Sequence, residues 1–260
     1  MNNTVLKTID ILKLLATTEE GLTITQIAQQ LDLVKTTVFN IIHTLEAQNF
    51  LEVDTKTKAY RIGSEAFHIG SAFLKNKSLD SVARPVLFDL RNKTNETVYL
   101  AGRSGTHDLI YLMKFRSNSI YQTIFSVGDV RHLLTTALGK AILAALPDET
   151  ALSCVTEKMY KTSSIPSIHD PLSLKEYLHI VRKDGYATDM TNENSAIACP
   201  VAAPILDNEG KVLGAISIVI MEDPTSEERI KELGSCVNKA AMELSRGLGF
   251  VGTDLFYQGR

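Results

Sequence analysis

The chain has 260 residues, of which 44% are hydrophobic and 22% charged, and its formal net charge is −3. This balance is typical of a globular protein with one large or two smaller domains, and it argues against a protein that coats nucleic acid non-specifically. The longest apolar run, LGAISIVIM at 213–221, is too short to cross a membrane, and no signal-peptide core is expected at the N-terminus. The three cysteines lie far apart without metal-ligand spacing, which predicts reduced thiols in a cytoplasmic protein.

Residues 1–63 have the pattern of a winged helix-turn-helix domain. Apolar residues recur at steps of three and four, which predicts helices over 4–16, 23–31 and 34–45, the second of them capped by Thr23 or Thr25. Two short β-rich runs, FLEV and AYRIG, follow and are joined by the polar segment DTKTK. Three helices followed by a small hairpin describe a winged helix-turn-helix.

The remainder of the chain predicts a linker helix and a second domain of the α+β class. The segment 64–78 is expected to be a helix with a broad apolar surface, suited to packing against another helix or another subunit. In 79–260, predicted helices alternate with an apparently antiparallel sheet that helices flank. The expected helices include RPVLFDLRNKT, TTALGKAILAAL, 172–182 and 226–248, and the expected strands are ETVYLAG, DLIYLMKF, PVAAPILD and KVLGAISIVI.

The third predicted helix carries short polar side chains opposite its apolar face. Val38, Ile41 and Ile42 point towards a core, whereas Thr36, Thr37, Asn40 and Thr44 point the other way, with Lys35 beside them. Hydroxyl and amide groups suit a helix in the DNA major groove, and we expect the two threonines also to cap the first turn. The alternative is a solvated helix face. The predicted DNA-binding residues are Thr25, Gln26, Lys35, Thr36, Thr37, Asn40, Thr44 and, on the hairpin, Lys56, Lys58 and Arg61.

The segment LTITQIAQQLDLVKTTVFNIIHTLEAQNFLE, followed by KAYRIG, resembles the winged helix-turn-helix of the IclR family of bacterial transcriptional regulators. Four later segments fall in the family's order: ETVYLAG, VGDVRHLLTTALGKAILAALP, KDGYATDMTNEN and VAAPILDNEGKVLGAISI. The resemblance implies a homodimer or tetramer whose GAF-like C-terminal domain binds a small molecule and alters DNA binding. Two-fold symmetry would make the operator in double-stranded DNA palindromic.

The resemblance also implies an effector pocket at the start of the helix in TALGKA. There a carboxylate can approach backbone N–H groups, so a small carboxylate or sugar-acid metabolite is the expected effector. The matching positions are Thr136, Ala137, Leu138, Asp189, Ile197, Cys199 and Ser217. Pro200 departs from the family's pattern, because it looks like an extra residue after the cysteine. The alternative is that Cys199 and Ser217 fill the core and that Asp189 caps a loop.

Other chemistry finds little support in the sequence. Gly139–Lys140 does not complete a phosphate-binding loop, because Leu134 and Ala141 stand where glycine and serine or threonine belong. The six histidines have no partner at ligand spacing, so neither a metal nor a cofactor is expected. The main rival is an enzyme that turns over a small acid, with Asp189 as base and Cys199 as nucleophile and with N-terminal helices that only dimerise. A third reading is a winged helix that docks protein instead of DNA.

Overall fold

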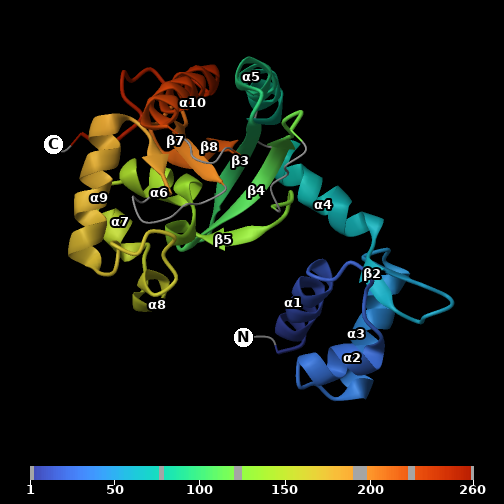
Figure 1. Ribbon diagram of the computed structural model, residues 1–260. Coiled ribbons are helices and arrows are strands. Elements are labelled where there is room, and N and C mark those ends of the chain that lie inside the picture. Colours follow the sequence, from blue (N-terminus) through green and yellow to red (C-terminus); the bar gives the residue numbers. More distant parts are fainter. Residues whose placement is uncertain (1–2, 76–78, 120–124, 190–197, 222–225, 259–260) are drawn as a thin grey trace. The chain divides into compact units, whose positions relative to one another are not determined.

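The computed structural model describes residues 3–75 (without the side chains of 71–75), 79–119, 125–189, 198–221 and 226–258. The chain divides into two compact units, Met1–Ser78 and Leu79–Arg260. Figure 1 shows a small, mainly helical N-terminal unit and a larger C-terminal unit built on a sheet. The α+β class and the order of an N-terminal helix-turn-helix before a helix-flanked antiparallel sheet agree with the sequence prediction.

The N-terminal unit is a three-helix bundle followed by a hairpin and a further helix. Its elements are α1 (Asn3–Ala16), α2 (Ile24–Gln30), α3 (Lys35–Ala47), β1 (Leu51–Val53), β2 (Tyr60–Ile62) and α4 (Ser64–Lys75). Ile11, Ile27 and Ile42 are fully buried at its centre. The strands β1 and β2 pair antiparallel, and Leu22 forms a bridge to Tyr60 that joins the hairpin to the segment before α2.

Two helix starts show how local chemistry fixes the helix-turn-helix. Thr23 caps α2 in a capping box, in which Gln26 N–H donates to Thr23 Oγ1 and Thr23 N–H donates to Gln26 Oε1. The start of α3 corrects our prediction, because its N-cap is Val34 and no side chain caps its first turn. Thr36 and Thr37 lie inside that first turn. A capping hydroxyl has to come from the residue before the turn, so these two hydroxyls cannot accept from its free N–H groups.

The C-terminal unit contains a six-stranded antiparallel sheet with the order β5-β4-β3-β8-β7-β6. The strands are β3 (Thr97–Ser104), β4 (Asp108–Phe115), β5 (Val130–His132), β6 (Ala187–Thr188), β7 (Cys199–Leu206) and β8 (Val212–Ile220). The helices are α5 (Leu79–Thr94), the 3-10 helix η1 (Leu133–Thr135), α6 (Ala137–Ala144), α7 (Asp148–Ser153), α8 (Glu157–Tyr160), α9 (Pro171–Asp184) and α10 (Glu227–Gly247). The helix α5 begins before the predicted RPVLFDLRNKT and includes Pro85.

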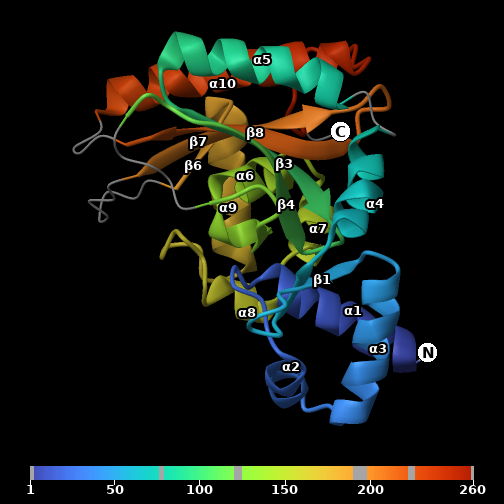
Figure 2. The same cartoon turned by 90° about the vertical axis from the view of Figure 1, so that its right-hand side faces the viewer.

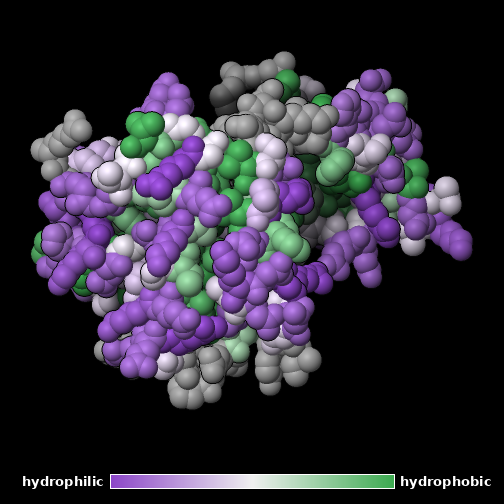
Figure 3. All heavy atoms as spheres, turned by 90° about the horizontal axis from the view of Figure 1, so that it is seen from above, coloured by the Kyte–Doolittle hydropathy of each residue, from purple (hydrophilic) through white to green (hydrophobic). Residues whose placement is uncertain are grey.

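Helices cover both faces of this sheet. In Figure 2, α5 and α10 lie side by side over one face, and α6 lies against the other face, with α9 packed on α6. The outer side of α5 and α10 is mainly hydrophilic, with hydrophobic side chains showing between the polar ones (Figure 3). Every residue of α6 is buried, so this short helix is the central element of its layer. No helix in the described residues is long and apolar enough to span a bilayer.

Candidate functional site: a DNA-facing helix and a buried polar site

The outward face of α3 has the composition that the sequence predicts. Val38, Ile41, Ile42 and Leu45 are buried, whereas Lys35, Thr36, Asn40 and Thr44 are exposed and Thr37 is half-buried. The Thr44 hydroxyl donates to the Asn40 carbonyl oxygen at 2.8 Å, so its hydrogen is directed along the helix. The amide of Asn40 and the hydroxyl of Thr36 extend from the exposed side of the helix, where a base edge or a phosphate can reach them.

The two predicted DNA-binding residues on α2, Thr25 and Gln26, differ in how many of their side-chain polar atoms remain available to DNA. Thr25 is exposed. The side-chain oxygen of Gln26 accepts from both the N–H and the hydroxyl of Thr23, each at 2.8 Å. Only the amide nitrogen of Gln26 therefore remains for an external partner.

The hairpin presents two of its three predicted cations at the tip. Lys56 and Lys58 are exposed, and Lys58 has a positive φ of 58° that tightens the turn. The Asp54 carboxylate accepts from the N–H groups of Lys56 and Thr57, and these hydrogen bonds lower its pKa. Arg61 lies back on β2, opposite Glu52, and its Nε donates to the Glu20 carbonyl oxygen at 3.1 Å. Arg61 thus supports the base of the hairpin, away from its tip.

Phe39 and His43 complete the exposed surface of α3, and the sequence reasoning did not select them. Phe39 is 48% exposed, and its ring meets the His43 ring edge-to-face with centroids 4.3 Å apart. A helical wheel places both residues outside the buried stripe, on the flank between that stripe and Asn40. Their placement was visible in the sequence, but the predicted DNA contacts comprised only hydroxyl, amide and cationic side chains.

In the C-terminal unit, the start of α6 holds a carboxylate from the protein itself. Asp189 Oδ2 accepts the Ala137 N–H at 2.9 Å, and the Thr136 hydroxyl caps the helix by accepting the Gly139 N–H at 3.1 Å. A Cβ on Gly139 would lie 2.0 Å from the Leu133 carbonyl oxygen, so glycine is needed for η1 to pack against α6. Thr136, Ala137, Leu138 and Asp189 are therefore brought together, as the resemblance implies.

Lys140 completes this cluster. Its side chain is fully buried, and its Nζ lies 2.6 Å from Asp189 Oδ1 and 2.5 Å from Ser164 Oγ. Burial lowers the pKa of Lys140, while the Asp189 carboxylate works in the opposite direction. In the sequence, Lys140 was considered only as part of a failed phosphate loop, and nothing local links it to Asp189, 49 residues further on.

The sheet register separates Cys199 from Ser217. Phe115 packs on Phe88 of α5, and Phe115 is the cross-strand partner of Val98. Cross-strand partners point to the same face of a sheet, so the face that carries Val98 is the one covered by α5 and α10. Ile218 and Val201 continue that side across β8 and β7, and Cys199 lies two residues before Val201 on the same side. Ser217, paired with Tyr99 and Ala202, faces α6 instead.

The structure therefore places the Cys199 side chain on the face of the sheet opposite Ser217. Its Sγ lies 3.7 Å from Thr188 Oγ1, and burial raises the pKa of its thiol to about 11, with a further contribution from the nearby Asp189 carboxylate. The physical reason is the alternation of side chains along β7, in which Cys199 and Val201 share the α10 side. Pro200 occupies the α6 side in its place. Ile197, also expected in the pocket, lies outside the described residues.

Two buried hydroxyls on the α6 side have no hydrogen-bond partner among the residues that the structure describes. Ser217 is 1% exposed and Tyr111 is 3% exposed. The Tyr111 ring contacts Tyr99 edge-to-face at 5.1 Å and stacks on Phe125 at 5.2 Å. Burial raises the pKa of Tyr111, and the nearby Asp189 carboxylate raises it further. Because buried polar groups are nearly always paired, two unpaired hydroxyls on one face point to a site built for a ligand or for water.

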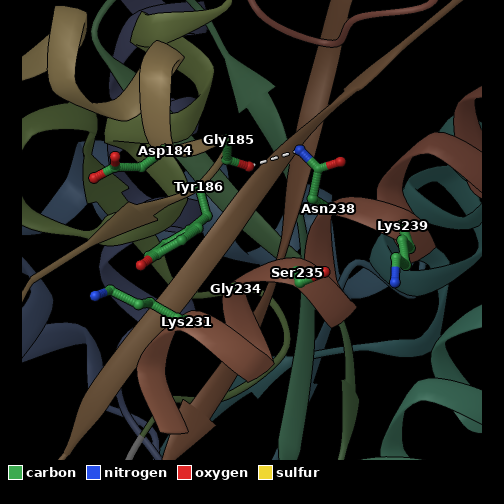
Figure 4. Close-up of a pocket in the computed structure, with 8 residues that line it drawn as sticks. All are labelled: Asp184, Gly185, Tyr186, Lys231, Gly234, Ser235, Asn238 and Lys239. Atoms are coloured by element: carbon green, nitrogen blue, oxygen red, sulfur yellow. Dashed lines mark hydrogen bonds between the residues drawn. The ribbon is translucent and has the colours of Figure 1, made fainter. Parts of the chain in front are cut away.

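A hollow of about 460 Å³ lies on the opposite side of the sheet, between α10 and the turn before β6 (Figure 4). Lys231 and Lys239 stand exposed at its edge, and the Asn238 amide already donates to the Gly185 carbonyl oxygen at 2.6 Å. This hollow offers surface charges and a satisfied amide. The α6 side offers two buried hydroxyls without a partner among the described residues, so it is the stronger candidate for a ligand site.

A helix-turn-helix with a wing, joined to a sheet domain with a buried polar site, is the architecture of a ligand-responsive DNA-binding regulator. Residues 4–55 match the IclR helix-turn-helix domain, and residues 71–246 match the family described as bacterial transcriptional regulator IclR C-terminal. The chain belongs to the IclR family. It is a transcriptional regulator, and the rival reading as an enzyme is not supported.

Individual relatives agree along nearly the whole chain. The HTH-type transcriptional regulator BhcR of Paracoccus denitrificans is 33% identical over 242 residues, which cover 93% of this chain and 86% of the relative. The transcriptional repressor IclR of Escherichia coli is 28% identical over 240 residues, or 92% of this chain and 87% of the relative. The crystal structure of the Thermotoga maritima IclR has a TM-score of 0.73 at 28% identity and covers 95% of this chain and 99% of its own.

Proposed function

We propose that the regulator reads a palindromic operator through α2, α3 and the hairpin, and that a small carboxylate or sugar-acid effector bound beside α6 changes this binding. The proposal includes a homodimer or homotetramer acting in the cytoplasm, with a GAF-like effector domain. The effector would favour one of two conformations and so change how two DNA-binding units are spaced on the operator.

The proposed DNA contacts fall into two kinds. Lys35, Lys56 and Lys58 would neutralise phosphates, and Thr36, Asn40 and Thr44 would reach base edges or sugar-phosphate oxygens. Thr25, Thr37 and the amide nitrogen of Gln26 would add contacts at the edge of this surface. Because a net charge of −3 gives no general attraction to DNA, binding must depend on this local surface.

The observation that carries the effector site is the pair of unpartnered, buried hydroxyls on Tyr111 and Ser217. Their hydrogens could be donated to oxygen atoms of the effector, whereas hydroxyl groups of a sugar acid could donate to Asp189. The positive end of the α6 dipole and Lys140 offset the negative charge of Asp189, which supports a ligand that carries one carboxylate. The proposed site comprises Thr136, Ala137, Leu138, Asp189, Ser217, Tyr111 and Lys140, with Ile197 retained from the family resemblance.

A gel-shift titration tests the whole proposal. The full-length protein is titrated against DNA fragments from upstream of its neighbouring genes at low salt, with and without a panel of small organic acids such as glyoxylate, pyruvate, lactate and gluconate. We expect one fragment to bind, and at least one acid that raises the melting temperature to change its Kd. Binding to no fragment, with or without acids, would contradict the DNA-binding proposal, whereas binding insensitive to every acid would contradict only the effector class.

A further inference from the structure

Phe39 is an apolar side chain on an otherwise polar helix face. It lies four residues after Lys35 and directly before Asn40, and it remains 48% exposed. Phenylalanine is a mediocre helix former, and a half-exposed ring gains little from burial. Neither helix propensity nor packing within the N-terminal unit explains why this residue type stands here.

The Phe39 ring is held in place before any partner arrives. Its edge-to-face contact with His43 has a centroid distance of 4.3 Å and an interplanar angle of 64°. His43 Nδ1 in turn lies 3.4 Å from Glu46 Oε2, so the three side chains form a row along one flank of α3. A side chain that is already ordered loses less conformational entropy when it binds.

The partner chemistry follows from what the major groove offers. Its floor presents hydrogen-bond donors and acceptors, and its distinctive apolar group is the C5 methyl of thymine. Asn40 has the side chain that pairs with adenine, and Phe39 projects from the exposed half of α3 about 100° away around the helix, so its ring would reach a neighbouring base pair of the same half-site. Recognition helices make base contacts mainly through their N-terminal residues, and Phe39 is the fifth residue of α3.

We propose that Phe39 is a specificity-determining residue that contacts a thymine methyl group in the same half-site as the base pair that Asn40 reads. The inference rests on the proposed use of α3 as the recognition helix. It adds an aromatic contact to the base contacts that the threonine, asparagine and lysine side chains of this helix can make.

Thymine-to-deoxyuridine replacement tests the contact, because it removes only the C5 methyl. Duplexes are selected from a random pool with the full-length protein, and each thymine of the best duplex is replaced singly by deoxyuridine. Fluorescence anisotropy gives the Kd for the wild type, for Phe39→Ala and for Phe88→Ala, a matched control with a 56% exposed phenylalanine on α5 of the C-terminal unit. Helical circular dichroism checks that each variant is folded.

We expect one thymine in each half-site at which the wild type and Phe88→Ala lose about fourfold in affinity per methyl removed. Phe39→Ala should bind the thymine and deoxyuridine duplexes equally well. An unchanged thymine preference in Phe39→Ala, or no sensitive thymine in the wild type, would overturn the inference while leaving the proposed function intact. Failure to enrich any duplex would overturn both.

Discussion

The exposed face of α3 and the buried site beside α6 are both polar, but they differ in the contacts that position their side chains. The side chains on α3 project from one helix, and their surroundings are set by residues three and four positions away. The site beside α6 joins Lys140 of that helix to Asp189, which follows β6, and these contacts depend on how distant parts of the chain align. The first site should therefore tolerate substitution without loss of stability, whereas the buried Lys140–Asp189 pair of the second should not.

The sharpest test of this difference is Asp189→Ala. The substitution leaves the Lys140 ammonium fully buried without its counter-charge, and we expect the free energy of unfolding to fall by about 3–5 kcal/mol. Urea unfolding of the full-length protein, followed by circular dichroism, measures the loss. Asp89→Ala is the control, because it breaks the exposed Asp89–Lys93 pair on α5 and should cause no resolvable change. A similar small effect for both variants would contradict the role of the buried pair.

The opposite behaviour is expected of Asn40→Ala on α3. Because Asn40 is exposed and its side chain supports no part of the unit, the free energy of unfolding should stay within about 0.5 kcal/mol of the wild type. Affinity for the operator should fall by about 10- to 100-fold, the effect of losing one bidentate base contact. Anisotropy titrations and urea unfolding on the same preparation measure the two quantities. A loss of stability with no loss of affinity would place Asn40 in a structural role.

The same contrast explains how far the sequence could predict the molecule. The α3 surface was predictable because Val38, Ile41, Ile42 and Leu45 define a stripe within a single helix. The N-cap at Val34 was missed because threonine has a capping side chain, yet the chain enters the helix earlier. The start of α6 followed from the family resemblance, but Lys140 needs a partner 49 residues away, and the side on which Cys199 lies depends on the register of β7 against β8. Neither is a local property of the sequence.

Tyrosine-to-phenylalanine substitutions distinguish a ligand site from ordinary core. Removing the Tyr111 hydroxyl should raise the free energy of unfolding by about 1 kcal/mol, because the folded state no longer buries an unpaired group. It should also reduce the melting-temperature increase given by whichever acid stabilises the wild type. The control is Tyr177→Phe, since the Tyr177 hydroxyl donates to the Thr188 carbonyl oxygen at 2.6 Å and accepts the Thr188 N–H at 3.2 Å.

We expect Tyr177→Phe to lower the free energy of unfolding by about 1 kcal/mol, opposite in sign to Tyr111→Phe. Thermal and urea unfolding of both variants beside the wild type give the comparison. If Tyr111→Phe destabilises the protein as much as its control, the Tyr111 hydroxyl has a structural partner, and the effector site loses its main support.

The smallest expected effect concerns Cys199 and tests the register directly. Its thiol is fully buried on the α10 side, and burial raises its pKa to about 11, so little thiolate exists at pH 8. Iodoacetamide at pH 8 should therefore modify the half-exposed Cys236 first, and Cys199 should react only slowly, through openings of the fold that expose its thiol. Peptide mass spectrometry follows both sites. An acid that stabilises the protein should slow the alkylation of Cys199 no more than its general stabilisation of the fold explains. Strong protection of Cys199 alone would show that this cysteine belongs to the effector site.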